Sequence, residues 1–194
     1  MSSFIKTFSQ KTVIVTGHTG FKGSWLSMWL SSLGAKVIGV SVDIPSKPSN
    51  FIASNVGNVI EDVRVDIRDA ESVCKLINKY KPDFVFHLAA KAIVRNSYEL
   101  PLETITTNAI GSANLLQATR SLDKLVAVVM ITSDKVYDNL EWNWGYRETD
   151  KLGGKDPYSA SKGMAELVIR SYVESFYNRS TSNVRIGVAR AGNV

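Results

Sequence analysis

The pattern that most restricts the fold is an alternation of short apolar, β-branched runs with longer amphipathic stretches along the whole chain. Within a run such as residues 12–16, apolar side chains occupy consecutive positions rather than every second one. Strands of that kind are buried on both faces, as in parallel sheets covered by helices on each side. The sequence therefore predicts an α/β fold with a doubly wound, Rossmann-type parallel sheet.

The alternation also predicts where each element lies. The predicted strands are residues 12–16, 36–42, 59–65, 83–88, 125–131 and 184–190. The predicted helices are residues 21–33, 69–80, 102–121 and 158–177. Trp25 and Trp29 are expected on one side of the first helix, which Gly34 ends, and Asp69 is expected to cap the second helix. The loop at 139–155 is long enough to suggest a function, and no linker divides the chain, so one domain is expected.

Charge and composition exclude several classes of partner. The net charge is +5, but Lys and Arg are scattered and do not alternate with aromatic residues, which disfavours nucleic acid. Apolar runs such as residues 126–131 are too short to cross a bilayer, and the first residues lack the features of a signal peptide. The single cysteine, Cys74, excludes an internal disulfide and fits a reducing compartment. We predict a cytoplasmic protein that binds a phosphate-bearing small molecule and neither nucleic acid nor membrane.

Three glycines follow the first predicted strand as Gly17-x-x-Gly20-x-x-Gly23 and lead into the first predicted helix. Glycines in this position allow a sharp turn, a close approach to a pyrophosphate and tight packing of helix on strand. The spacing differs from the commonest dinucleotide fingerprint, and a bare turn remains the alternative. His18 and Lys22 would add positive charge beside a pyrophosphate, or would simply be solvated.

Asp43 lies twenty residues after Gly23, at the end of the second predicted strand. A carboxylate there would accept hydrogen bonds from an adenosine ribose and repel a 2′-phosphate, which favours NAD over NADP. The alternatives are a turn aspartate ahead of Pro45, and a phosphate contact from Lys47 that would favour NADP.

Two further groups of polar residues suggest catalysis. Tyr158 and Lys162 stand four residues apart, on one face of a helix, where the ammonium would favour the phenolate and make the tyrosine a base. Ser133, Asp134 and Lys135 follow the fifth predicted strand, at the sheet edge where open α/β sheets bind ligands. A chance pair and a hydrophilic strand exit are the respective alternatives.

In combination, the glycine turn, Ser133 on the fifth strand and the Tyr158–Lys162 pair resemble the extended short-chain dehydrogenase/reductase family. The resemblance extends to Asp66–Ile67, to residues 88–91 and to Thr107–Asn108. It implies NAD as the cofactor and no metal. The implied cofactor-binding residues are Gly17, Thr19, Gly20, Phe21, Lys22, Gly23, Asp43, Asp66, Ile67, Leu88, Ala89, Ala90, Lys91, Thr107, Tyr158 and Lys162.

Within that family, residues 17–26, 132–139, 141–148 and 189–194 are most similar to the CDP-glucose 4,6-dehydratases, which serve deoxysugar and O-antigen synthesis. In dTDP-glucose dehydratases the triplet resembles Thr-Asp-Glu, and Ser133-Asp134-Lys135 departs from it. The resemblance implies that Tyr158, aided by Ser133, takes the sugar 4-hydroxyl proton while NAD takes the C4 hydride. Lys135 is then the candidate base at C5, with a pKa lowered by burial or by Lys162, and Asp134 the acid at the 6-hydroxyl.

Family members continue into a smaller substrate domain, so residues 1–194 are expected to be the NAD-binding domain, without the substrate domain. Asn193 resembles a residue that contacts the substrate phosphate. The two helices at 102–121 and 158–177 match subunit-pairing helices, which implies a homodimer, although their apolar residues could instead face the sheet. A catalytically silent NAD-binding module and a nucleotide-sugar 4-epimerase are the alternative functions.

Overall fold

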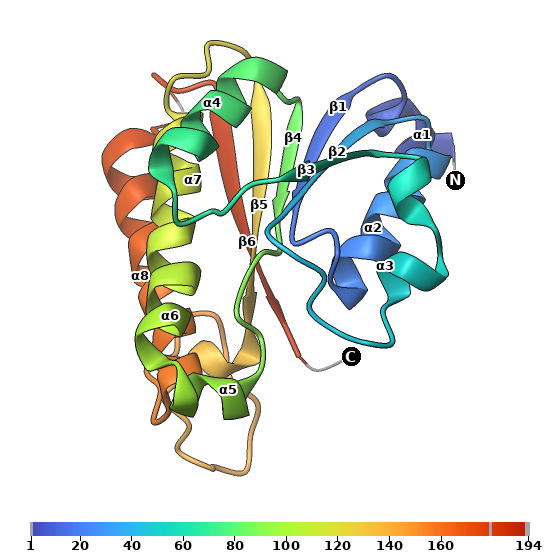
Figure 1. The fold of residues 1–194 in the computed structure, drawn as a ribbon. Coiled ribbons are helices and arrows are strands. Elements are labelled where there is room, and N and C mark those ends of the chain that lie inside the picture. The colour runs from blue at the N-terminus through green and yellow to red at the C-terminus, as the bar shows by residue number, and fades with distance from the viewer. Residues whose placement is uncertain (1, 179, 193–194) are drawn as a thin grey trace.

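The computed structural model describes residues 2–178 and 180–192 (Figure 1). Over these residues the chain forms a six-stranded sheet in the order β3-β2-β1-β4-β5-β6, and every neighbouring pair of strands is parallel. The sheet confirms the predicted doubly wound α/β fold.

The strands coincide with the predicted apolar runs. Their bounds are β1 Thr12–Thr16, β2 Lys36–Ser41, β3 Glu61–Arg64, β4 Phe84–His87, β5 Val126–Ser133 and β6 Val184–Ala191. β3 is shorter than predicted, because its pairing with β2 begins only at Glu61.

The helices include several short ones that no sequence period had indicated. Their bounds are α1 Ser2–Phe8, α2 Phe21–Ser32, α3 Asn50–Ala53, α4 Ala70–Tyr80, α5 Val94–Glu99, α6 Pro101–Ile105, α7 Gly111–Thr119 and α8 Pro157–Phe176. The turns η1 Val56–Asn58 and η3 Asp134–Val136 are 3₁₀, and η2 Thr106–Ile110 is π-helical. The helix predicted at 102–121 is therefore α6, η2 and α7 in succession. None of the described helices is long and apolar enough to span a membrane.

Helices cover both faces of the sheet, with α4, α7 and α8 on one face and α1 and α2 on the other (Figure 1). Alternate residues of β1 pack into the two hydrophobic clusters, one on each face of the sheet. Ile14 packs with the first group of helices, and Val13 and Val15 pack with Leu30 of α2. All of these side chains are fully buried, as the consecutive apolar positions had predicted.

The face of α2 that meets the sheet is not the one that carries the two tryptophans. Gly23, Ser27 and Leu30 are buried there, whereas Trp25 and Trp29 are exposed. The helix begins so close to the preceding turn that a Cβ on Gly23 would stand 2.1 Å from the Gly17 carbonyl oxygen. Small side chains therefore occupy most of the packed face.

Candidate functional site

The strand order reverses between β1 and β4, and in sheets of this kind ligands bind in the crevice at the carboxyl ends of the strands on either side of that point. The predicted site residues come from segments at this edge. The glycine turn follows β1, residues 88–91 follow β4, Ser133 ends β5, and Tyr158 lies in the first turn of α8.

Each glycine of the turn has a geometric reason. Gly17 has φ of +76°, and a Cβ added to it would lie 2.7 Å from the Ala89 backbone nitrogen. Gly20, the N-cap of α2, provides no side-chain cap, and the first turn of the helix has no acidic residue. The backbone N–H groups at this helix start are thus open to an anion, as a dinucleotide pyrophosphate requires.

Hydrogen bonds join the glycine turn to the residues that follow β2 and β6. Thr19 is buried, and its hydroxyl donates to the backbone carbonyl of Asp43 at 2.6 Å, which holds the residues after β2 against the turn. The Asp43 side chain is exposed there, as is Lys47. Phe21 is exposed at the start of α2, and the Lys22 ammonium donates to the Gly192 carbonyl at 3.2 Å.

His18 takes neither of its predicted roles. Its ring is fully buried, and its Nε2 lies 3.0 Å from Oδ1 of Asp62. The ring fills the space beside Gly39, where an added Cβ would come within 2.4 Å of it. Burial lowers the pKa of His18 more than the neighbouring Asp62 raises it. The residue is therefore a packed core histidine, and neither a cation beside the pyrophosphate nor a solvated side chain.

Asp66 and Ile67 follow β3 and lie near the start of α7. Hydrogen bonds from Arg68 lower the pKa of Asp66 despite partial burial, and its Oδ2 stands 2.6 Å from the Arg68 guanidinium. Ile67 is buried against Gly111, whose Cβ would otherwise stand 2.6 Å from it.

The segment from Leu88 to Lys91 is held from both sides. Leu88 N–H donates to the Thr16 carbonyl, and Lys91 is bonded through both backbone groups to the side chain of Asn108 in η2. Ala89 and Ala90 between them are partly exposed. Thr107 is buried beside Asn108, and its hydroxyl has no partner among the described residues.

A hydrogen-bonded chain beneath this segment fixes the tautomer of His87. Ala89 N–H donates to the Thr16 hydroxyl at 3.2 Å, so that hydroxyl is free to donate to His87 Nδ1 at 2.8 Å. The Ser112 hydroxyl donates to the Asn108 carbonyl at 2.7 Å, so it accepts from His87 Nε2 at 3.1 Å. From these bonds we assign the Nε2–H tautomer.

Tyr158 and Lys162 lie in α8, which Asp156 caps by accepting from Ser159 N–H at 2.9 Å. Their exposed fractions are only 8% and 7%. Burial, followed by the positive charge of Lys22, lowers the pKa of Lys162 to about 8. Burial and the Lys162 charge together lower the pKa of His87 to about 3. The charge of Lys22, in the glycine turn, thus acts on Lys162 in α8.

Ser133, Asp134 and Lys135 interact with one another. The Ser133 hydroxyl donates to Asp134 Oδ1 at 3.0 Å, and the Lys135 ammonium pairs with Asp134 Oδ2 at 2.8 Å. Partial burial raises the pKa of Asp134, but hydrogen bonds from Lys135 and Ser133 outweigh it and hold that pKa below its usual value. The Lys135 side chain is 42% exposed, so the burial that was expected of it is not found. The charge that acts on Lys162 comes from Lys22 rather than from Lys135.

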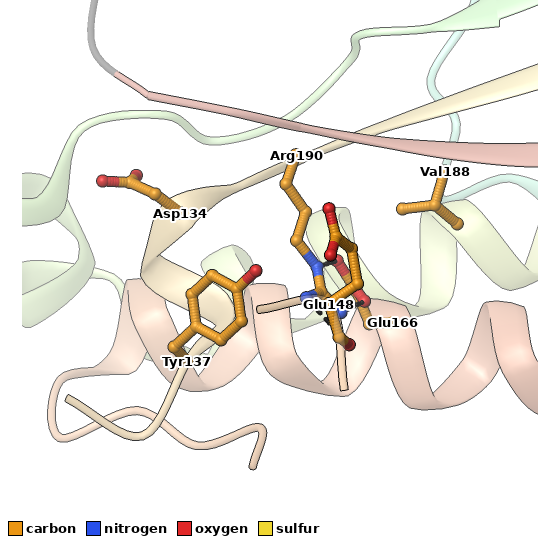
Figure 2. Close-up of a pocket in the computed structure, with 6 residues that line it drawn as sticks. All are labelled: Asp134, Tyr137, Glu148, Glu166, Val188 and Arg190. Atoms are coloured by element: carbon orange, nitrogen blue, oxygen red, sulfur yellow. Dashed lines mark hydrogen bonds and ion pairs between the residues drawn. The ribbon is translucent and has the colours of Figure 1, made fainter. Parts of the chain in front are cut away.

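Two cavities of about 500 Å³ each meet at Asp134 and Tyr137. The first also contains Lys135 and is lined in addition by Asn139, Tyr146, Gly154, Lys155, Asp156 and Ser159. The second lies toward β6 and is lined in addition by Glu148, Glu166, Val188 and Arg190 (Figure 2). Asn193, the predicted phosphate contact, lies outside the described residues.

Sequence reasoning did not single out His87 or the Glu166–Arg190 ion pair, which lie at the carboxyl edge of the sheet. His87 had a weak signal, a polar residue at the end of an otherwise apolar strand. Glu166 had none, because a glutamate in a helical segment is ordinarily interpreted as solvated.

Residues 14–187 match the sequence profile of the protein family described as GDP-mannose 4,6 dehydratase. The chain is 50% identical to the CDP-glucose 4,6-dehydratase of Salmonella typhimurium, over 97% of this chain and 54% of that protein. It is 33% identical to the CDP-paratose 2-epimerase of Salmonella typhi, over 84% of this chain and 53% of that protein. The chain thus spans about half the length of these relatives.

Among solved structures, the chain resembles the UDP-glucose 4-epimerase of Thermus thermophilus in complex with NAD. The TM-score is 0.77 at 29% identity, over 92% of this chain and 54% of that one.

Proposed function

The chain belongs to the GDP-mannose 4,6-dehydratase family, and we propose that it is the NAD-binding part of an enzyme that dehydrates CDP-glucose at C4–C6. The observation that carries this proposal is a glycine turn with no room for a Cβ at Gly17 or Gly23, at the sheet edge where α8 begins with the buried Tyr158 and Lys162. This arrangement would combine a dinucleotide cradle with a Tyr-x-x-x-Lys pair, and the charge of Lys22 in the turn acts on Lys162. The 50% sequence identity to the Salmonella CDP-glucose 4,6-dehydratase supports the choice of substrate.

We assign the cofactor to the crevice between β1 and β4. The pyrophosphate would lie on the amides of the glycine turn, the ribose near Asp43, and the nicotinamide near Tyr158. Bound NAD would supply hydride transfer, accepting hydride from C4 of the sugar and returning it to C6. The absence of room for a Cβ at Gly17 and Gly23, and the open helix start at Gly20, fit such a group.

Tyr158 and Ser133 are assigned to the 4-hydroxyl. The Tyr158 phenolate would accept its proton, and the Ser133 hydroxyl would hold its oxygen. Lys162, buried one turn along α8, would supply the positive charge that favours the phenolate.

Asp134 and Lys135 are assigned to loss of water, as acid at the 6-hydroxyl and base at C5. This step needs the pair as carboxylic acid and free amine. Moving one proton across the 2.8 Å contact, from ammonium to carboxylate, supplies both required states at once. A bound sugar that expels water from the adjoining cavity would favour the neutral pair, because desolvation penalises the two charges.

The test has two stages. Calorimetry with NAD should detect binding to the chain and none to Gly17→Ala, while Gly187→Ala should bind normally because its added Cβ meets nothing within 4 Å. The whole enzyme, given NAD and CDP-glucose, should form a 4-keto sugar with alkaline absorbance. Lys135→Ala should keep C4 oxidation and lose the elimination, and unchanged dehydration would refute its role.

A 4-epimerase of the same fold would interconvert sugar epimers without forming that 4-keto product. The Asp134–Lys135 pair favours dehydration, because epimerisation at C4 has no hydroxyl to expel. A silent NAD-binding module would bind NAD in the first stage and turn over nothing in the second.

We further propose a homodimer formed through α6, η2 and α8. These segments pack on one another and leave Leu102, Ile110, Met164 and Leu167 exposed. Exposed large apolar side chains gathered on neighbouring helices are typical of an association surface. A cytoplasmic location, and a place in making deoxysugars such as those of O-antigens, complete the proposal, with the single cysteine as support for the location.

A further inference from the structure

A buried ion pair lies behind the candidate reaction centre, among residues that have no role in the proposal so far. Arg190 of β6 donates from Nε to Glu166 Oε1 at 2.7 Å and from Nη2 to Oε2 at 2.6 Å. Two parallel bonds of this kind lock the guanidinium and the carboxylate in one relative orientation. The side chains are only 17% and 8% exposed, and both line the cavity that contains Asp134 (Figure 2).

Glu166 ties the catalytic helix to the strand that carries Ser133. Its Oε1 accepts a hydrogen bond from the Thr132 hydroxyl at 2.7 Å. Thr132 directly precedes Ser133 and is the register partner of Arg190 across β5 and β6. Glu166 stands four residues after Lys162 on α8, one turn along the same face. One carboxylate thus connects the helix of Tyr158 and Lys162 to the ends of two strands.

Arg190 extends the connection to the loop beyond the reaction centre. Its guanidinium lies over the Tyr137 ring, 4.7 Å from the ring centre, and its Nη1 donates to the Glu148 carbonyl at 3.2 Å. Tyr137 directly follows η3, the turn that contains Asp134 and Lys135. The position of that turn is therefore coupled to the ion pair.

Ring stacking carries the same connection along the loop at 139–155. Tyr137 stacks on Tyr146 with centroids 4.8 Å apart, Tyr146 contacts Trp142 at 5.0 Å, and Trp142 stacks on Trp144 at 5.2 Å. A continuous column of planar groups thus runs from Arg190 to the exposed Trp144.

We propose that Glu166 is a positioning residue, which acts through Thr132 and Arg190 to set Ser133 and the Asp134–Lys135 turn relative to Tyr158 and Lys162. The inference rests on the proposed dehydration, because that reaction needs groups from β5, η3 and α8 around one sugar. Misplacing reacting groups by about 1 Å costs roughly 100-fold in rate. A link among these elements therefore affects turnover more than ligand binding.

The first test is kinetic and uses the whole enzyme with bound NAD. Glu166→Gln removes the charge, and Thr132→Val removes only one hydroxyl and leaves the ion pair intact. Both should lower kcat for CDP-glucose roughly 10- to 100-fold, with KM changed by less than about twofold and the NAD content unchanged. Glu174→Gln, on the same helix, breaks an exposed pair with Arg170 and should change none of the three. If Glu166→Gln does not fold, Thr132→Val decides alone.

The second test is spectroscopic and needs no turnover. The stacked Trp142–Trp144 pair should give an exciton-coupled circular dichroism band, which Trp144→Phe would identify by removing it. Glu166→Gln should weaken that band, and Glu174→Gln should leave it unchanged.

Normal kcat in Glu166→Gln and Thr132→Val would overturn the proposal, and so would a loss of NAD or a raised KM that accounts for the fall in rate. If the wild-type enzyme binds NAD but does not dehydrate CDP-glucose, the proposed function fails on its own. In that case the circular dichroism band of Trp142 and Trp144 tests whether Glu166 positions the Asp134–Lys135 turn. An unchanged band in Glu166→Gln would overturn the proposal.

Discussion

Replacing Lys162 with methionine should stabilise the fold at neutral pH, although the lysine is assigned to catalysis. Its ammonium is almost wholly buried and faces a second cation, so burial and Lys22 lower its pKa from 10.5 to about 8. One pKa unit corresponds to about 1.4 kcal/mol, so holding the charge in the folded state at pH 7 costs about 3 kcal/mol. Methionine has a similar length and carries no charge, so Lys162→Met removes that cost.

The sign and the pH window follow from proton linkage. Between pH 8 and 10.5 the unfolded chain keeps the Lys162 proton that the folded chain has lost, so wild-type stability rises with pH relative to the variant. The advantage of Lys162→Met should thus shrink from about 3 kcal/mol at pH 7 to about 1 kcal/mol at pH 9.5.

Urea unfolding of both proteins at the two pH values measures this difference, and other titrating groups cancel in the comparison. Lys75→Met is a matched control, because Lys75 is exposed in an i,i+4 pair with Glu71 and should matter by less than about 0.5 kcal/mol. Equal stability of wild type and Lys162→Met at pH 7, or a difference that does not depend on pH, would refute the reasoning.

Three further predictions use other parts of the structure. Burial lowers the pKa of His87 to about 3, so acidification from pH 7 to 4.5 should cost about 3 kcal/mol through this residue, and His87→Gln should show a flatter acid limb in urea unfolding. Asp43→Asn should improve NADP binding relative to NAD roughly tenfold in calorimetry, by removing the repulsion of a 2′-phosphate; an unchanged ratio would contradict the ribose assignment. Leu167→Lys should convert the proposed dimer to a monomer in sedimentation, whereas Val59→Lys, at a similarly exposed position elsewhere, should leave the sedimentation unchanged.

The parts of the fold that local sequence determines were predicted well. Consecutive apolar residues specified β1, and the Asp69 cap was confirmed by bonds from the Glu71 and Ser72 amides. The glycine turn was predictable for the same reason, since its spacing and its neighbours are contiguous in the chain. Gly34, with φ of +83°, ends α2 as expected.

What depends on distant residues was not predictable. The burial of His18 requires a glycine at position 39 and a carboxylate at Asp62, neither of which its own neighbours indicate. Trp25 and Trp29 are exposed, because the face of α2 that packs against the rest of the domain carries Gly23, Ser27 and Leu30 instead. Glu166 has the pattern of a surface residue until β6 places Arg190 beside it.

The repulsion between Lys22 and Lys162 also makes cofactor binding a proton-linked event. A pyrophosphate on the glycine turn would bring negative charge to Lys22 and offset its effect on Lys162, which should raise the pKa of Lys162 above about 8. By linkage, the protein should take up a fraction of a proton when NAD binds near pH 8. It should take up almost none at pH 6, where Lys162 is already charged. Calorimetry in buffers of different ionisation enthalpy measures this uptake, and Lys162→Met should abolish it. Proton release on binding, or an uptake that persists in the variant, would show that the two lysines are not coupled through the cofactor site.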